Sequence, residues 1–231
     1  MFATPSTSSL DPARVYEPAE DSYFFLDVLQ DQMDYIRQRF PSTADTAAPV
    51  ILELGTGSGI VSTFVQKYIL TDAVHFATDI NPYACATALK TSQENGGTRF
   101  FDVVRTDLWA GFRPNIVDIL LFNPPYVPDE QTASFESAVT SDDWLDFALL
   151  GGKDGMKITS IVLNTMQTIL SSNVGIAYIL FCKRNNPAAV ALSMRHRGWI
   201  VDMISERKAG WEVLSIWRFT QPGHQDLVTK S

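Results

Sequence analysis

The stretch Val50-Ile51-Leu52-Glu53-Leu54-Gly55-Thr56-Gly57-Ser58-Gly59 decides how this chain folds. Its first five residues form a short apolar run typical of a buried strand, and three glycines spaced two apart follow at once. Residues 60–70 continue with apolar side chains at helical spacing. Open α/β sheets bind nucleotides at such a strand, loop and helix, because the glycines let a ligand lie against bare backbone.

A regular alternation of strands and helices surrounds this stretch. Before it we expect a helix over residues 24–36, where the preceding Glu20, Asp21 and Ser22 suit a helix N-terminus. After it, the sequence predicts strands at residues 74–80, 100–104, 116–122 and 175–182, with helices at residues 82–95, 142–150 and 156–170. Two antiparallel strands are predicted at residues 199–205 and 211–219. The pattern predicts an α/β fold whose parallel sheet has helices on both faces and ends in an antiparallel hairpin.

Length and composition bound the organisation of the chain. With 231 residues, 45% of them hydrophobic, it can bury one sizeable core, and we expect one domain over residues 15–220. Ser, Thr and Pro dominate residues 1–14, which predicts a disordered segment, and we expect residues 221–231 to form a flexible tail. The N-terminus has neither a basic region nor an apolar stretch, and apolar runs are only strand-length, which indicates a soluble cytoplasmic or nuclear protein.

Charge and metal-binding residue types argue against several kinds of site. A net charge of -8 repels phosphate backbones, which argues against nucleic acid as the main substrate. Cys85 and Cys182 fit buried thiols better than a disulfide or a zinc knuckle. His75, His196 and His224 are scattered, without the spacing that would place two on one helix face. We therefore predict no metal in this chain.

The acid before the glycine loop indicates which ligand the loop receives. A dinucleotide fingerprint has its third glycine where Ile60 stands, and pyrophosphate needs a helix N-terminus free of carboxylates. Glu53 stands directly before the loop and therefore favours a ligand with positive charge. Asp79 ends the next predicted strand about 20 residues beyond Gly59, where a carboxylate either accepts both ribose hydroxyls or merely caps the strand.

Asn123-Pro124-Pro125-Tyr126 follows the fourth predicted strand and is the most informative tetrapeptide of the chain. Its two prolines stiffen the backbone, remove two donors and leave rigid carbonyls projecting into the site. The Asn123 side-chain oxygen and the Pro124 carbonyl can then accept both N–H groups of a planar nitrogen, while Tyr126 stacks on its plane. The plain alternative is a proline-rich turn, which the preceding glycine loop and Asp79 disfavour.

Together these features resemble the class I S-adenosylmethionine-dependent methyltransferases, and the tetrapeptide resembles the group that methylates planar nitrogen. The resemblance implies a Rossmann-like, seven-stranded, mostly parallel sheet in the order 3-2-1-4-5-7-6, with S-adenosylhomocysteine as the product of the cofactor. It implies that Asp107 accepts from the adenine amino group, although Asp107 alone would be an ordinary turn residue. The implied cofactor-binding residues are Ser22, Glu53, Gly55, Thr56, Gly57, Asp79, Ile80, Asp107, Leu108 and Asn123.

Five segments resemble more narrowly the catalytic subunit of the eukaryotic release-factor glutamine methyltransferases. They are Val15-Tyr16-Glu17-Pro18-Ala19-Glu20-Asp21-Ser22 and residues 123–128, 144–146, 149–156 and 207–214. The resemblance, which extends over residues 15–219, implies methylation of the glutamine in the Gly-Gly-Gln loop of a class I release factor. Its implied catalytic residues are Asn123, Pro124, Pro125 and Tyr126. It places Ser22 on the cofactor carboxylate, whereas local sequence supports a helix cap equally well.

The same resemblance implies a small zinc-binding activator subunit, and leaves open whether the release factor must carry its GTPase partner. Phe100-Phe101-Asp102-Val103-Val104 would be an apolar strand at a sheet edge, a hazard unless it is covered. We expect the activator to add a strand there. Two alternatives stay open: methylation of adenine or of protein lysine by the same site, and a non-catalytic cofactor-binding scaffold.

Overall fold

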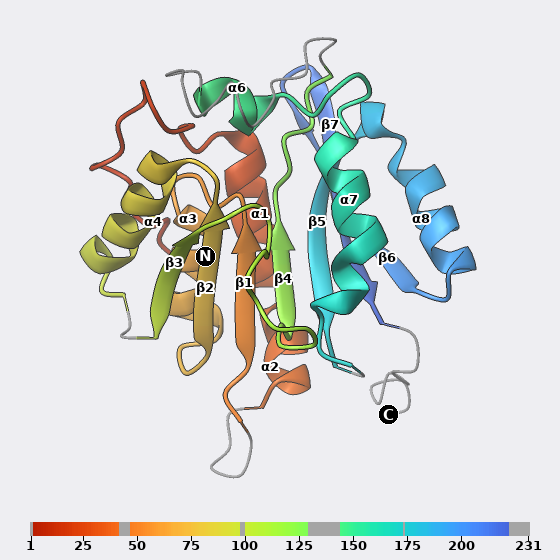
Figure 1. Ribbon diagram of the computed structural model, residues 1–231, viewed down its shortest axis with the longest axis horizontal. Coiled ribbons are helices and arrows are strands. Elements are labelled where there is room, and N and C mark those ends of the chain that lie inside the picture. Colours follow the sequence, from red (N-terminus) through yellow and green to blue (C-terminus); the bar gives the residue numbers. More distant parts are fainter. Residues whose placement is uncertain (1, 42–46, 98–99, 129–143, 173, 222–231) are drawn as a thin grey trace.

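The computed structural model describes residues 2–41, 47–97, 100–128, 144–172 and 174–221, and its centre is one seven-stranded sheet (Figure 1). The strands are β1 (Val50–Leu54), β2 (Val74–Asp79), β3 (Phe101–Arg105), β4 (Ile119–Phe122), β5 (Ile176–Cys182), β6 (Ile200–Ala209) and β7 (Glu212–Thr220). Their order, β3-β2-β1-β4-β5-β7-β6, confirms the predicted topology. β1 to β5 pair in parallel, and β7 runs antiparallel to both β5 and β6.

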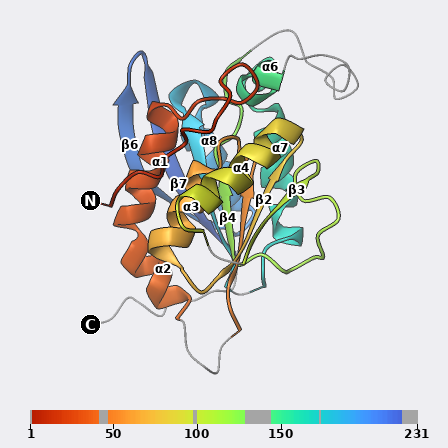
Figure 2. The same cartoon turned by 90° about the vertical axis from the view of Figure 1, so that its left-hand side faces the viewer.

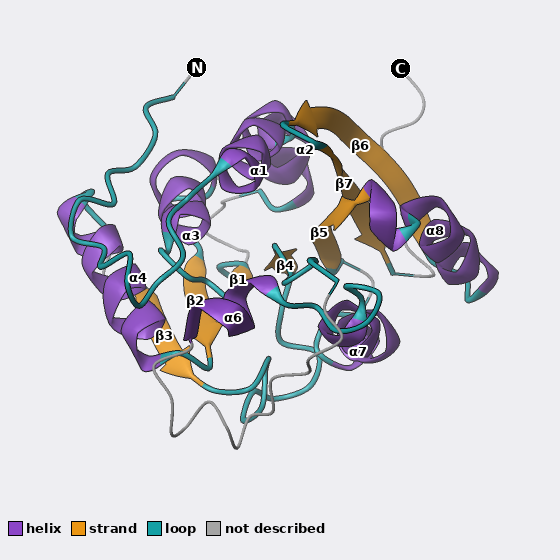
Figure 3. Ribbon diagram, turned by 90° about the horizontal axis from the view of Figure 1, so that it is seen from above, coloured by secondary structure: helices purple, strands orange, loops and turns teal. Residues whose placement is uncertain are grey.

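Helices cover both faces of the sheet, as Figure 3 shows from above. On one side lie α1 (Glu20–Asp31), α2 (Met33–Arg39), α3 (Ile60–Phe64) with its π-helical continuation (Val65–Ile69), and α4 (Pro82–Glu94); on the other lie α7 (Lys157–Thr165), the 3₁₀ turn Met166–Thr168, and α8 (Pro187–His196). The short helix α6 (Trp144–Leu149) lies over the carboxyl ends of the strands (Figure 1). None of the described helices is long and apolar enough to cross a membrane.

Alternate side chains of the strands build two cores, one against each layer of helices. In β5 every residue is buried; Tyr178 and Leu180 face the core under α1 and α3, whereas Ile179 and Phe181 face the core under α7 and α8. A strand buried on both faces reads as a continuous apolar run, which is why the sequence marked β5 clearly. The two cores fix the strand ends against which the site is built.

Several element boundaries differ from the predictions. The helix expected over residues 24–36 is broken at Gln32, whose φ of -88° and ψ of 1° leave the helical region, so α1 and α2 are separate. The expected strand at residues 116–122 is regular only in β4, with Val117 in an isolated bridge to Leu170. α8 was not predicted, although Pro187 occupies its first turn in the manner typical of a helix start.

Residues 2–14 are placed against the helices, in contrast to the disorder that their composition predicted (Figure 2). The Phe2 ring stacks on Tyr68 with centroids 4.6 Å apart. Ser6 and Asn95 exchange two hydrogen bonds, from Ser6 N to Asn95 Oδ1 at 2.9 Å and from Asn95 Nδ2 to the Ser6 carbonyl at 2.8 Å. These contacts hold residues 2–14 in place, although the low apolar content of the segment favours disorder. The tail predicted at residues 221–231 lies outside the described residues beyond Gln221.

Candidate active site

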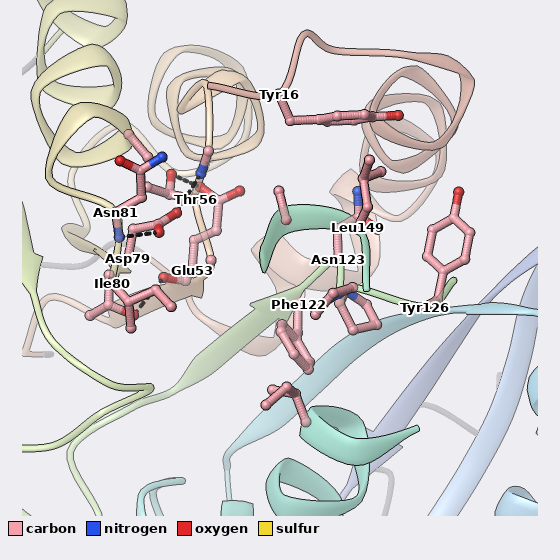
Figure 4. A pocket seen from close by; sticks show the side chains of 18 of the residues that line it. Tyr16, Glu53, Thr56, Asp79, Ile80, Asn81, Phe122, Asn123, Tyr126 and Leu149 are labelled. Atoms are coloured by element: carbon pink, nitrogen blue, oxygen red, sulfur yellow. Dashed lines mark hydrogen bonds between the residues drawn. The ribbon is translucent and has the colours of Figure 1, made fainter. Parts of the chain in front are cut away.

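A cavity of about 390 Å³ opens at the carboxyl ends of β1, β2 and β4 (Figure 4). Its walls come from the segment before α1, the glycine loop, the ends of β2 and β4, α6 and the start of α7. All the predicted site residues line it: Ser22, Glu53, Gly55, Thr56, Gly57, Asp79, Ile80, Asp107, Leu108, Asn123, Pro124, Pro125 and Tyr126. The structure therefore brings together segments that lie about one hundred positions apart in the sequence.

The three glycines of the loop all have positive φ, but they serve different needs. Gly59 (φ 76°) lies so close to α4 that an added Cβ would stand 2.5 Å from the Cα of Ala88. Gly55 (φ 59°) and Gly57 (φ 53°) would place a Cβ in open space, with no atom within 4 Å. Gly59 thus permits close packing of the helices, whereas Gly55 and Gly57 leave room for a ligand beside bare backbone.

Glu53 is buried at the floor of the cavity, with 4% of its surface exposed. Its Oε2 accepts hydrogen bonds from Thr56 Oγ1 at 2.8 Å, from Ser62 N at 3.1 Å and from Ser62 Oγ. Burial raises the pKa of Glu53 to about 7, against the opposing effect of these hydrogen bonds. Because all three bonds end on Oε2, Oε1 is left for a cationic group, whose charge would favour the ionised form.

Asp79 is held rigidly at the end of β2. One carboxylate oxygen accepts from Gly57 N at 3.0 Å and the other from Asn81 N at 2.9 Å. Burial raises the pKa of Asp79, and the backbone hydrogen bonds from Asn81, Gly57 and Ile80 oppose that rise. The two bonds fix the carboxylate plane, and each oxygen keeps a lone pair for a further donor such as a hydroxyl.

Asp107 and Leu108 form the cavity wall after β3. Asp107 is exposed, and its carbonyl accepts from Ala110 N at 2.9 Å, which makes the segment a turn. Leu108 has a φ of 49°, an unfavourable conformation for a residue with a Cβ. The turn holds the Leu108 side chain, which is partly buried, at the cavity. An apolar side chain beside an exposed carboxylate suits a flat heterocycle with an amino group.

Asn123 lies at the other end of the cavity from Asp79 (Figure 4), and Asp21 of α1 orients its side chain. Asn123 Nδ2 donates to Asp21 Oδ2 at 3.0 Å, and Asp21 Oδ1 accepts from Ser22 N at 2.7 Å. Asn123 Oδ1 is buried and has no hydrogen-bond partner among the described residues. Since an unpaired buried acceptor is costly, Asn123 Oδ1 is ready for a donor on a ligand.

Tyr16, Tyr126 and Asp21 line this end of the cavity, and the carboxylate of Glu212 lies near both tyrosines. Burial, followed by the charges of Asp21 and Glu212, raises the pKa of Tyr16 to about 12. The same causes, together with a hydrogen bond to Glu212, raise the pKa of Tyr126 further. Both phenols therefore stay neutral at physiological pH. Tyr126 offers an uncharged ring for stacking and is unsuited to act as a general base.

Sequence reasoning missed Asp21, Tyr16 and Glu212 as parts of the site. Asp21 was interpreted as a favourable acid near the start of a helix and, through the resemblance, as part of the segment Glu17 to Ser22 over the cofactor. Its contact with Asn123, which spans 102 positions, was not predicted. Glu212 begins β7, and its proximity to Tyr126 depends on how the hairpin folds back onto the sheet. The resemblance over residues 15–22 and 207–214 was the only signal that pointed to these segments.

Comparison with known proteins identifies the family. Residues 30–140 match the family described as Methyltransferase small domain. The eRF1 methyltransferase catalytic subunit mtq2 of Schizosaccharomyces pombe is 37% identical over 236 residues, covering 97% of this chain and 98% of that protein. Methyltransferase HEMK2 of Homo sapiens is 34% identical over 213 residues, covering 90% of each. The chain belongs to this methyltransferase family.

Membership of the methyltransferase family confirms the reaction class that the tetrapeptide and glycine loop predicted. Among solved structures, the E. cuniculi Mtq2-Trm112 complex, described as responsible for methylation of the eRF1 translation termination factor, matches with a TM-score of 0.61 and 24% identity. That match covers 90% of this chain and 99% of the other, and at this identity it supports the fold. The cavity at the carboxyl ends of β1, β2 and β4 lies where open α/β sheets bind their ligands, which makes it the candidate active site.

Proposed function

We propose that this chain is the catalytic subunit of a methyltransferase that uses S-adenosylmethionine to methylate the glutamine side chain in the Gly-Gly-Gln loop of a class I release factor. The observation that carries the proposal is the state of Asn123. Its Nδ2 is tied to Asp21 at 3.0 Å, while its buried Oδ1 has no partner among the described residues. Fixing one end of the carboxamide leaves the other as an oriented acceptor for the target N–H.

The cavity fits the proposed cofactor along its length. Glu53 and the open backbone at Gly55 and Gly57 suit the methionine part, whose ammonium matches the acidic floor. Asp79 suits the ribose hydroxyls, and the wall at Asp107 and its neighbour suits the adenine. Bound S-adenosylmethionine supplies an electrophilic methyl group. Ser22, which lines the same cavity near Asp21, is the proposed contact for the cofactor carboxylate.

Catalysis by this chain consists mainly of positioning. An amide nitrogen is a weak nucleophile because its lone pair is delocalised, so it must be held with that lone pair aimed at the methyl group. Asn123 Oδ1 and the Pro124 carbonyl accept its two N–H groups, and neutral Tyr126 stacks on the amide plane. Once methylated, the nitrogen is acidic and loses its proton to water, so no side chain has to act as a base beforehand.

The substrate assignment rests on the relatives and on the shape of the site. The Schizosaccharomyces pombe protein, similar over nearly the whole chain, is named for eRF1. Two glycines beside the target residue would let a slender backbone reach Asn123 past the flanking Tyr16 and Tyr126. Adenine and lysine also present N–H donors, and the net charge of -8 disfavours nucleic acid among them. Methylation assays with the release factor alone, and with the release factor bound to its GTPase partner, show which of the two is the substrate.

A small zinc-binding activator is the proposed second subunit, added at the free edge of β3. Among the described residues, β3 pairs only with β2, and no other described strand covers its outer edge. Val103 N donates to the exposed Asp102 carboxylate at 2.8 Å and so lies outside the ladder with β2. Phe100, next to this strand, is 45% exposed. An incoming strand would take over the Val103 N–H and cover the apolar edge.

Labelled S-adenosylmethionine tests the proposal when the purified heterodimer receives the release factor, its Gln→Ala loop variant, or adenine-containing DNA. We expect label on the release factor alone. Label on DNA, or equal label on the loop variant, would replace the substrate assignment with one of the alternatives. Labelling of none of the three under conditions in which the heterodimer binds the cofactor would support the non-catalytic scaffold.

A further inference from the structure

The loop at residues 149–155 clamps the backbone of the proposed catalytic tetrapeptide. Val127 N donates to the Leu149 carbonyl at 3.0 Å, and Gly151 N donates to the Val127 carbonyl at 2.8 Å, so residues 149–151 pair with the chain directly after Tyr126. A Cβ at Gly151 would collide with the Pro125 carbonyl. The loop at residues 149–155 thus lies directly against the peptide units that carry the catalytic groups.

Asn185 joins this clamp to the end of β5. It closes the 3₁₀ turn Lys183–Asn185, and only 6% of its surface is exposed. Its Nδ2 donates to the Tyr126 carbonyl at 3.3 Å and to the Asp154 carbonyl at 3.2 Å. Its Oδ1 accepts from Cys182 N at 2.9 Å. One side chain therefore connects the tetrapeptide, the clamping loop and the central sheet.

The chemistry of the three partners specifies a carboxamide. Two of the partners are carbonyl oxygens, which require donors, and the third is an N–H, which requires an acceptor. Asn supplies both donors and the acceptor from one short, planar group. Asp would keep the acceptor for Cys182 but would face two carbonyls with a carboxylate, and Ala would leave all three groups unpaired in a buried place.

We propose that Asn185 is a positioning residue: through the Tyr126 carbonyl it fixes where the Pro124 carbonyl and the Tyr126 ring stand relative to the target nitrogen. The inference rests on the proposed role of the tetrapeptide in binding that nitrogen. Asn185 does not line the cavity and acts only through the backbone it holds. A backbone free to shift by about 1 Å at a reacting centre loses on the order of a hundredfold in rate.

The Asn185→Asp variant separates the positioning role from a structural one, because it keeps the bond to Cys182 and loses the two donors. We expect kcat of the heterodimer on the release factor to fall by about tenfold or more, while the Kd for S-adenosylmethionine changes by less than about threefold. The deficit should shrink at lower pH, where the protonated Asp regains one donor. The matched control Asn164→Asp changes an exposed residue of α7 and should leave kcat and its pH profile unchanged.

Hydrogen exchange provides a readout that needs no substrate. In Asn185→Asp, the peptide containing the Tyr126 and Val127 amides should exchange faster than in the wild type, whereas the amides of β1 should not. Unchanged kcat together with unchanged hydrogen exchange in Asn185→Asp would overturn the inference. Weaker cofactor binding together with faster exchange of the β1 amides would also overturn it, because both would indicate general destabilisation. Failure of the wild type to label the release factor would overturn the proposed function instead, and exchange would still decide the role of Asn185.

Discussion

Replacing Glu53 with Gln should make the protein more stable and bind its cofactor less well. The carboxyl is buried, and burial raises its pKa from the ordinary 4.5 to about 7. Between these values the folded chain keeps a proton that the unfolded chain has lost, so the contribution of Glu53 to stability falls as pH rises from 4.5 to 7. Gln has the same shape and accepts the same bonds from Thr56 and Ser62, but it carries no charge.

The size of the effect follows from the raised pKa of Glu53. A rise from 4.5 to about 7 costs the ionised, folded chain about 3 kcal/mol at pH 8, since each tenfold change in proton affinity corresponds to about 1.4 kcal/mol. At pH 5.5 less of that cost has developed. The amount by which Glu53→Gln exceeds the wild type in free energy of unfolding should therefore be about 2 kcal/mol smaller at pH 5.5 than at pH 8. The pKa of His75 is lowered by burial to about 4, but that group is present in both proteins and its titration cancels in the comparison.

Urea unfolding of the wild type and Glu53→Gln at pH 5.5 and 8 measures this difference. Both proteins should be compared with the activator at one fixed concentration, because association adds to apparent stability. Calorimetry with S-adenosylmethionine should show a Kd raised about tenfold or more in the variant, since a bond to a charged partner is lost. Equal advantages of Gln at both pH values, or an unchanged Kd, would refute the assigned role of Glu53.

Further variants probe the orientation of Asn123, the glycine loop and the free edge of β3. Asp21→Asn should lower kcat by about tenfold, because it removes the charged acceptor that orients the catalytic carboxamide, while the Kd for the cofactor stays within about threefold; a normal kcat would contradict this. Gly59→Ala should lower the melting temperature clearly, because the added Cβ meets α4. Gly57→Ala should mainly weaken cofactor binding, with a loss of about 1 kcal/mol in the free energy of unfolding. Equal melting temperatures of the two variants would refute the separate roles of Gly59 in packing and Gly57 in binding. Val103→Pro removes the N–H at the outer edge of β3 and should weaken activator binding, whereas Val103→Thr keeps it and should not. Co-purification measures the binding, and equal recovery of the activator with both variants would place it elsewhere.

The sequence predicted the centre of the fold well, because its signals there are local. The apolar run of β1, the glycine loop and the capped start of α4, where Asn81 accepts from Tyr83 N at 2.9 Å, all occur within single elements. α8 was missed although Pro187 marks its first turn. Short amphipathic helices give weaker periodic signals than buried strands do.

The groups that position Asn123 and Tyr126 were harder to predict, because they come from distant segments. Asp21 meets Asn123 only after α1 packs against α3 and the β6–β7 hairpin, and Asn185 meets Tyr126 only after β5 pairs with β4. Neither contact leaves a local pattern in the sequence. Residue types with several common roles, such as an acid near a helix start or an Asn after a strand, acquire their function from tertiary contacts.

The central claim is that Asn123 holds the side-chain nitrogen of a release-factor glutamine for methylation. Its most direct test is mass spectrometry of the Gly-Gly-Gln peptide after reaction of the release factor with wild-type or Asn123→Ala heterodimer and S-adenosylmethionine. We predict one methyl group on the glutamine side chain with the wild type, and a rate lower by on the order of a hundredfold or more with the variant, at nearly unchanged cofactor affinity. A methyl group on another residue, or full-rate methylation by Asn123→Ala, would contradict the account.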